Sequence, residues 1–160
     1  MWRKPPPAER PAEAVASAEE QKLLVAAAAA VGPGGYRRFA DIPAHQLGRT
    51  LRGKLYKLTR QLPDDERDNL IARIKSAATS CTSALAAGFG EGTTRSAIRG
   101  ALASRGALVA VQDHLDLAVE QEWLDAEERE ALRVEIDEMI AAVNTFLGEL
   151  VRDSDRLGGG

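Results

Sequence analysis

The sequence has few of the residues that build disulfide frameworks, metal centres and sheets. It contains one cysteine and two histidines among 160 residues, and aromatic side chains account for only 4%. The single cysteine, Cys81, excludes an internal disulfide framework and fits a reducing compartment. Because aromatic and β-branched residues are sparse while alanine and leucine are abundant, the composition favours helices over strands.

Long apolar runs are also missing. The longest, residues 23–31, has nine residues, whereas a transmembrane helix needs about 20. Arg3 and Lys4 precede this run as they would in a secretory leader, but the prolines at 5–7 and four glutamates interrupt the approach. We therefore expect a cytoplasmic protein that does not associate with membranes.

Proline and glycine divide the chain into parts. Residues 1–12 hold four prolines and are predicted to be disordered or extended, and the alanine-rich residues 13–31 could form a helix. Gly32-Pro33-Gly34-Gly35 then breaks the chain. We predict an N-terminal extension at 1–35, a helical domain at 36–153 and a flexible tail at 154–160.

Four stretches of the helical domain repeat apolar or small residues in steps of three and four, the spacing of an amphipathic helix. The first stretch begins near Asp41, which could cap it, and stops at Pro63; Asp64 or Asp65 could cap the second. The third begins at Thr93 or Thr94, and the fourth after Asp125. The predicted inward residues are Ala44, Gly48, Leu51, Leu55, Leu58 and Leu62; Leu70, Ile74, Ala77, Cys81, Leu85 and Gly88; Ile98, Ala101, Leu108, Val111, Leu115 and Ala118; and Leu132, Ile136, Met139, Val143, Phe146 or Leu147, and Leu150.

Short turns between four such helices make neighbouring helices antiparallel. Small residues along the second helix, 76–88, would let it approach its neighbours closely, and the glycines at 88, 90 and 92 would end it. The predicted fold class is therefore all-α: an antiparallel up-down-up-down four-helix bundle with an N-terminal extension.

No arrangement of catalytic or metal-binding residues is visible. The Glu-x-x-His pairs of bundle metal sites are absent, so His45 and His114 are interpreted as polar surface or rim residues. Nothing near Cys81 would lower its pKa, and residues 88–92 lack the Gly-Lys-Ser/Thr ending of a phosphate loop. We expect no metal, no cofactor and no enzymatic activity.

The net charge of −3 is unevenly distributed along the chain. Residues 36–62 carry seven basic side chains and one acidic side chain, whereas residues 125–160 carry ten acidic and four basic side chains. At 100° per residue, Arg49, Lys57 and Arg60 lie opposite the apolar stripe of the first helix, with Arg52 and Lys54 on its flanks. We call these five cations the basic ridge.

A line of lysine and arginine side chains can displace counterions from a nucleic-acid backbone. Charge alone fits equally well with a solvated face, or with a face that pairs with the acidic fourth helix of a neighbouring subunit. We expect no aromatic side chains among the ridge residues to support base stacking. The candidate nucleic-acid-binding residues are Arg49, Arg52, Lys54, Lys57 and Arg60, followed by Arg73 and Lys75.

Three motifs carry a family resemblance. Phe39-Ala-Asp-Ile-Pro-Ala-His-Gln46 is similar to a Phe-x-Asp-Leu-x-Val-Trp-Gln pattern, and Tyr56-Lys-Leu-Thr-Arg-Gln-Leu-Pro63 to a Tyr-x-Leu-Thr-x-x-Phe-Pro pattern. Residues 80–91 resemble a Ser-x-Pro-Ser-Asn-Ile-Ala-Glu-Gly-Phe-Gly-Arg signature, and the spacing to Gly106, Leu115 and Trp123-Leu124 is also similar. With these motifs, residues 36–152 resemble the four-helix-bundle family named for the 23S rRNA intervening sequence. That family includes the accessory variability determinant (Avd) proteins of diversity-generating retroelements.

The resemblance implies a four-helix bundle that assembles into a ring-like homopentamer with a basic surface and is not an enzyme. Avd-type members bind nucleic acid and partner a reverse transcriptase, so RNA, DNA and a reverse transcriptase are the implied partners. The first hypothesis is therefore a non-enzymatic oligomer that binds nucleic acid or a nucleic-acid enzyme. The alternative is a protein-interaction scaffold in which basic and acidic helices meet across subunits and the N-terminal extension recruits a partner.

Overall fold

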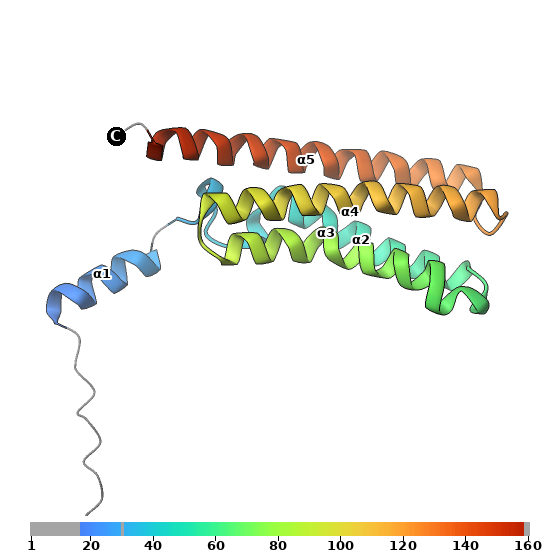
Figure 1. Ribbon diagram of the computed structural model, residues 1–160, viewed down its shortest axis with the longest axis horizontal. Helices are drawn as coiled ribbons and strands as arrows, with labels where there is room; N and C mark the ends of the chain where they lie inside the picture. Colours follow the sequence, from blue (N-terminus) through green and yellow to red (C-terminus); the bar gives the residue numbers. More distant parts are fainter. Residues whose placement is uncertain (1–16, 30, 159–160) are drawn as a thin grey trace, which may run out of the picture. The chain divides into compact units, whose positions relative to one another are not determined.

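The computed structural model describes residues 17–29 and 31–158, which form helices and turns without any β-strand (Figure 1). The predicted all-α class is confirmed for these ranges. The chain divides into two compact units, one ending at residue 30 and the other beginning at Val31. The predictions for residues 1–16 and 159–160 lie outside the described residues.

The first unit contains helix α1, Ala18–Ala29, inside the stretch predicted to be helical. Ser17 begins it with a capping box: its hydroxyl accepts the N–H of Glu20 at 3.2 Å, and the Glu20 carboxylate accepts the N–H of Ser17 at 2.7 Å. Leu23 is 69% exposed. Reciprocal capping therefore defines the start of α1.

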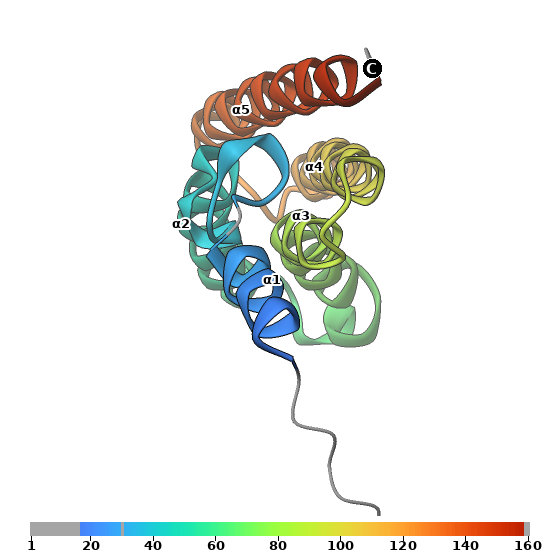
Figure 2. The same cartoon turned by 90° about the vertical axis from the view of Figure 1, so that its left-hand side faces the viewer.

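The second unit contains four long helices. They are α2 (Pro43–Leu58), α3 (Ala72–Gly90), α4 (Thr94–Glu120) and α5 (Ala126–Gly158). Helices α2 and α4 each pack against both α3 and α5, so the four helices enclose one hydrophobic core (Figure 2).

The boundaries of this unit differ from the predicted ones at both ends. The 3-10 turn Pro33–Gly35, assigned to the extension, packs on α5, where the Gly34 N–H donates to the Asp153 carboxylate at 2.8 Å. Helix α5 continues to Gly158, beyond the predicted start of the tail at residue 154. Contacts between segments distant in sequence thus extend the unit in both directions.

Two of the predicted helix caps are wrong. Asp41 belongs to a 3-10 turn, Phe39–Asp41, and pairs with Arg38 at 3.0 Å, while Ile42 precedes α2 without a side-chain cap. Before α3, Glu66 accepts the N–H of Leu70 at 3.1 Å and begins a π-helical turn, Arg67–Ile71. These turns replace the simple caps that local sequence indicates.

The starts of α4 and α5 agree with the sequence. The Thr93 hydroxyl accepts the N–H of Ser96 at 3.1 Å, and the Asp125 carboxylate accepts the N–H of Glu127 at 3.0 Å. A polar cap next to a periodic apolar run is a local signal, which explains why both positions could be predicted.

The predicted inward residues form the core. All are buried except Ile98, which is half-buried, and Phe146 rather than Leu147 occupies the inner position on α5. Phe89 packs partly against this core after the small-residue stretch of α3. The steps of three and four therefore identify the buried faces of all four helices.

Helices α3 and α4 lie so close together that their backbones are in contact at the crossing. A Cβ atom added to Gly88 would lie 2.6 Å from the Ser96 carbonyl oxygen, and one added to Gly100 would lie 2.4 Å from the Ala84 carbonyl oxygen. The Ser96 hydroxyl donates to the Gly88 carbonyl at 2.9 Å. Because there is no space for a methyl group, glycine is required at both crossing positions.

This close approach predicts opposite effects for two glycine substitutions on α4. Gly100→Ala should lower the free energy of unfolding by about 1–3 kcal/mol because the new methyl group meets backbone atoms that cannot move aside. Gly106→Ala is the matched control: nothing lies within 4 Å of its added Cβ, so it should raise that free energy by about 0.5–1 kcal/mol. Urea denaturation measures both changes, and equal midpoints for the two variants would contradict the described crossing.

Candidate nucleic-acid interface

Four members of the basic ridge lie on α2 and Arg60 lies in the 3-10 turn after it, Thr59–Gln61, and they face different neighbours. Arg49, Lys57 and Arg60 are exposed. Arg52 is half-buried and donates from Nη1 to the Thr82 hydroxyl of α3 at 2.8 Å, whereas Lys54 places Nζ 2.6 Å from a Glu135 carboxylate oxygen on α5. The ridge therefore has an outer line and two flanks that contact α3 and α5.

The flank toward α5 is partly neutralised within the chain. Lys54, Lys57 and Gln61 line a shallow pocket of about 310 Å³ together with Glu128 and Glu135. Gln61 Nε2 also donates to the Glu128 carboxylate at 3.2 Å. Pairing between the basic and acidic helices thus occurs inside one protomer.

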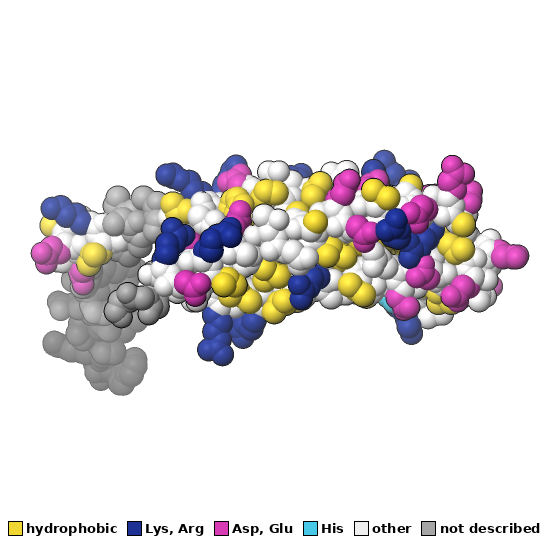
Figure 3. Space-filling model, turned by 90° about the horizontal axis from the view of Figure 1, so that it is seen from above, with side chains coloured by type: hydrophobic (Ala, Val, Ile, Leu, Met, Phe, Trp, Pro, Cys, Tyr) yellow, Lys and Arg dark blue, Asp and Glu magenta, His cyan; other side chains and the backbone are white. Residues whose placement is uncertain are grey.

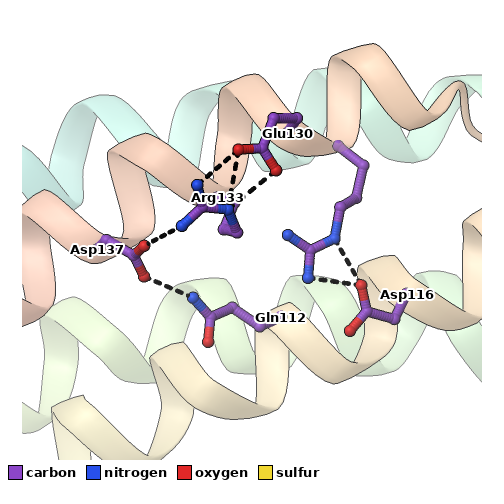
Figure 4. A network of polar contacts seen from close by, with 6 residues as sticks. Gln112, Asp116, Glu130, Arg133 and Asp137 are labelled. Carbon is purple, nitrogen blue, oxygen red and sulfur yellow. Dashed lines mark hydrogen bonds and ion pairs between the residues drawn. The ribbon is translucent and has the colours of Figure 1, made fainter.

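Further pairing within the chain involves other acidic residues of α5. Arg133 bridges Glu130 and Asp137, and Gln112 of α4 donates to Asp137 at 2.9 Å (Figure 4). The hydrogen bond from Arg133 lowers the pKa of Glu130. Arg129 of α5 also forms an ion pair with Asp116 of α4 at 2.5 Å. Figure 3 shows the same mixture of charges over α5, with carboxylates gathered toward its start.

The flank toward α3 contains an aromatic residue that the sequence analysis missed. Tyr56 is 41% exposed, and its hydroxyl hydrogen-bonds to that of Thr79 at 3.1 Å. Lys75 Nζ lies 5.4 Å from the centre of its ring. The expectation that no aromatic side chain lies among the cations is wrong, although the position of Tyr56 between Lys54 and Lys57 could have indicated it.

The two second-rank residues are not together. Lys75 lies toward α2 beside Tyr56, whereas Arg73 lines a pocket between α3 and α4 that also contains Asp68 and His114. Residues two positions apart on a helix point in directions that differ by about 200°, which explains the separation. Arg73 and Lys75 therefore belong to different faces.

His45 is buried, so its interpretation as a surface or rim residue is wrong. It is 5% exposed, and its ring lies edge-on to Phe39 with 4.9 Å between the ring centres. Among the described residues, nothing hydrogen-bonds to its buried Nδ1 atom. Such an unpaired polar atom costs about 1–3 kcal/mol of stability.

Burial controls the titration of both His45 and Cys81. Desolvation, followed by the charges of Arg52 and Arg49, lowers the pKa of His45. Burial raises the pKa of Cys81 to about 11, and its Sγ donates to the Ala78 carbonyl. The thiol is therefore protonated near neutral pH and is not an activated nucleophile.

Within residues 17–29 and 31–158, no group of three or more histidine, cysteine, aspartate or glutamate residues could hold a metal ion. No helix there is both long and apolar enough to cross a membrane.

The chain matches a known protein family. The family described as 23S rRNA-intervening sequence protein matches residues 40–145, a range that contains α2, α3, α4 and α5 as far as residue 145. No curated protein matches the chain.

The buried His45 predicts a specific pH dependence of stability. Its pKa is lowered in the folded protein, so below about pH 6.5 the unfolded chain binds a proton that the folded chain does not. The free energy of unfolding should therefore fall between pH 7.5 and 5.5. His45→Phe should make that fall smaller, because phenylalanine binds no proton in the unfolded chain.

Urea denaturation of both proteins at the two pH values measures the difference. His114 is present in each, so the difference belongs to His45. Identical pH dependence in the two proteins would contradict a lowered pKa at this position.

Proposed function

The chain belongs to the 23S rRNA-intervening sequence protein family, and from this membership we propose a non-enzymatic, oligomeric protein that binds RNA or DNA through α2. The family name points to an RNA-related role. The supporting observation is that Arg49, Lys57 and Arg60 are exposed and take no part in the described ion pairs. Such side chains contact phosphates and position a backbone without recognising its sequence.

We infer that α2 to α5 form an antiparallel up-down-up-down four-helix bundle. Two short connections support this inference: residues 91–93 join α3 to α4, and residues 121–125 join α4 to α5. Short connections place consecutive helices side by side in opposite directions. The bundle would leave the outer surface of α2 free for a ligand.

We propose a homo-oligomer, with five subunits as the number implied by the family resemblance. Outward-facing apolar side chains on α4 support contact with a second copy: Leu102, Val109 and Leu117 are 42–54% exposed. A reverse transcriptase is the proposed protein partner because the family that the motifs at 39–46, 56–63 and 80–91 resemble includes Avd-type proteins, which partner one. A cytoplasmic location completes the proposal.

The alternative is a protein-interaction scaffold whose residues 1–35 recruit a partner, without nucleic-acid binding. It relies on pairing between basic and acidic helices of different subunits. Lys54 already pairs with Glu135 in its own chain, and Arg133 occupies Glu130 and Asp137. These internal pairs favour nucleic acid over a neighbouring α5 as the ligand of the remaining cations.

Charge reversal at two exposed residues of the ridge, Arg49 on α2 and Arg60 in the turn after it, tests the proposed function. We expect Arg49→Glu with Arg60→Glu to weaken duplex binding roughly tenfold to hundredfold at low salt, because two phosphate contacts are lost. The slope of log affinity against log salt should become shallower by about 2, since each contact contributes about 0.9. Fluorescence anisotropy with a labelled RNA duplex at 50 and 200 mM salt measures both quantities.

The control is Arg95→Glu with Arg99→Glu, which makes the same change in net charge on exposed residues of α4. It should reduce affinity much less than the α2 pair. Equal losses for the two double variants, or no binding of the unaltered protein to either duplex or single-stranded RNA at 50 mM salt, would reject the proposal.

A further inference from the structure

A pocket beside the first half of α2 combines aromatic, cationic and hydroxyl groups. Its volume is about 400 Å³, and its lining comes from the 3-10 turn before α2, from α2 and from α3. Phe39, which is 43% exposed, lines the pocket together with Arg49 and Arg52. Thr82 and Ser83 contribute hydroxyl groups to the lining. None of the residues that line this pocket is acidic, so the local charge favours an anion.

His45 provides a second and independent indication of a ligand. His45 lines the same pocket, although the residue is only 5% exposed. Its Nδ1 has no hydrogen-bond partner among the described residues. Buried polar atoms in folded proteins are nearly always paired. A polar group entering the pocket would provide the missing partner for the imidazole.

The same side of α2 carries a second aromatic side chain with a cation beside it. Tyr56 follows Arg52 by four residues and Arg49 by seven, so the three side chains share one face of the helix. Tyr56 is 41% exposed, and Lys75 of α3 lies over its ring. The α2–α3 face thus presents two exposed aromatic rings, each accompanied by cations.

We propose that the α2–α3 face binds single-stranded nucleic acid, with an unpaired base against Phe39, its phosphate between Arg49 and Arg52, and a polar edge of the nucleotide on His45. A base can stack on an aromatic side chain only when its own face is free, which excludes the interior of a duplex. The arginines supply the phosphate contacts that position the strand. The inference rests on the proposed function and narrows its ligand from nucleic acid in general to unpaired strands.

The test compares one strand in two states. A labelled 20-nucleotide RNA of mixed sequence without self-complementarity is titrated with the full-length protein, alone and annealed to its complement, at 50 mM salt. We expect the single strand to bind at least fivefold more tightly than the duplex. Phe39→Leu should weaken binding of the single strand by roughly fivefold to hundredfold, the range that stacking of one base supports, and leave duplex binding unchanged.

Leu47→Ala is the matched control, since it removes a side chain of similar exposure, 40%, from α2, the helix that follows the turn of Phe39; it should alter neither affinity. Tyr56→Leu gives a second variant if Phe39→Leu lowers the thermal unfolding midpoint, and it should show the same selective loss. Equal binding of strand and duplex, or equal effects of the Phe39 and Tyr56 variants on both, overturns the inference but leaves the proposed function intact. Absence of binding to either RNA rejects both.

Discussion

The backbone contact between α3 and α4 is the constraint on which the other features depend. Gly88 and Gly100 remove the side chains that would separate the helices, and the Ser96 and Ser104 hydroxyls hydrogen-bond to α3 carbonyls at 2.9 and 2.6 Å. Helix α3 is therefore held closely against α4. Another side of α3, which carries Thr79, Thr82 and Ser83, contacts α2.

The charge distribution follows from that arrangement. On the α5 side of α2, lysines meet the carboxylates of the same chain and are partly neutralised. On the α3 side, the neighbouring residues are hydroxyl-bearing and small, so Arg49 and Arg52 have no carboxylate partner among residues 17–29 and 31–158. The two flanks of one basic helix therefore differ in chemistry, although the linear sequence shows a single run of cations.

Much of the fold could be predicted because the burial pattern is local. Steps of three and four identified most core residues, although Ile42, Ile71, Ala78, Ala97 and Leu124 were not among them, and Thr93 and Asp125 marked two helix starts. The π-helical turn after Glu66 could not be predicted, because no local signal distinguished Glu66 from Asp64 or Asp65 as the cap.

The candidate site was predicted less completely than the fold. Arginine and lysine positions on α2 follow from helical geometry, but the burial of His45 depends on packing against Phe39, which no periodicity indicates. Mapping the bound strand by amide chemical-shift changes tests the central claim most directly. We expect the changes to fall at residues 39–56 and 75–86, with little change at 100–117; changes concentrated on the outer faces of α4 and α5 would contradict it.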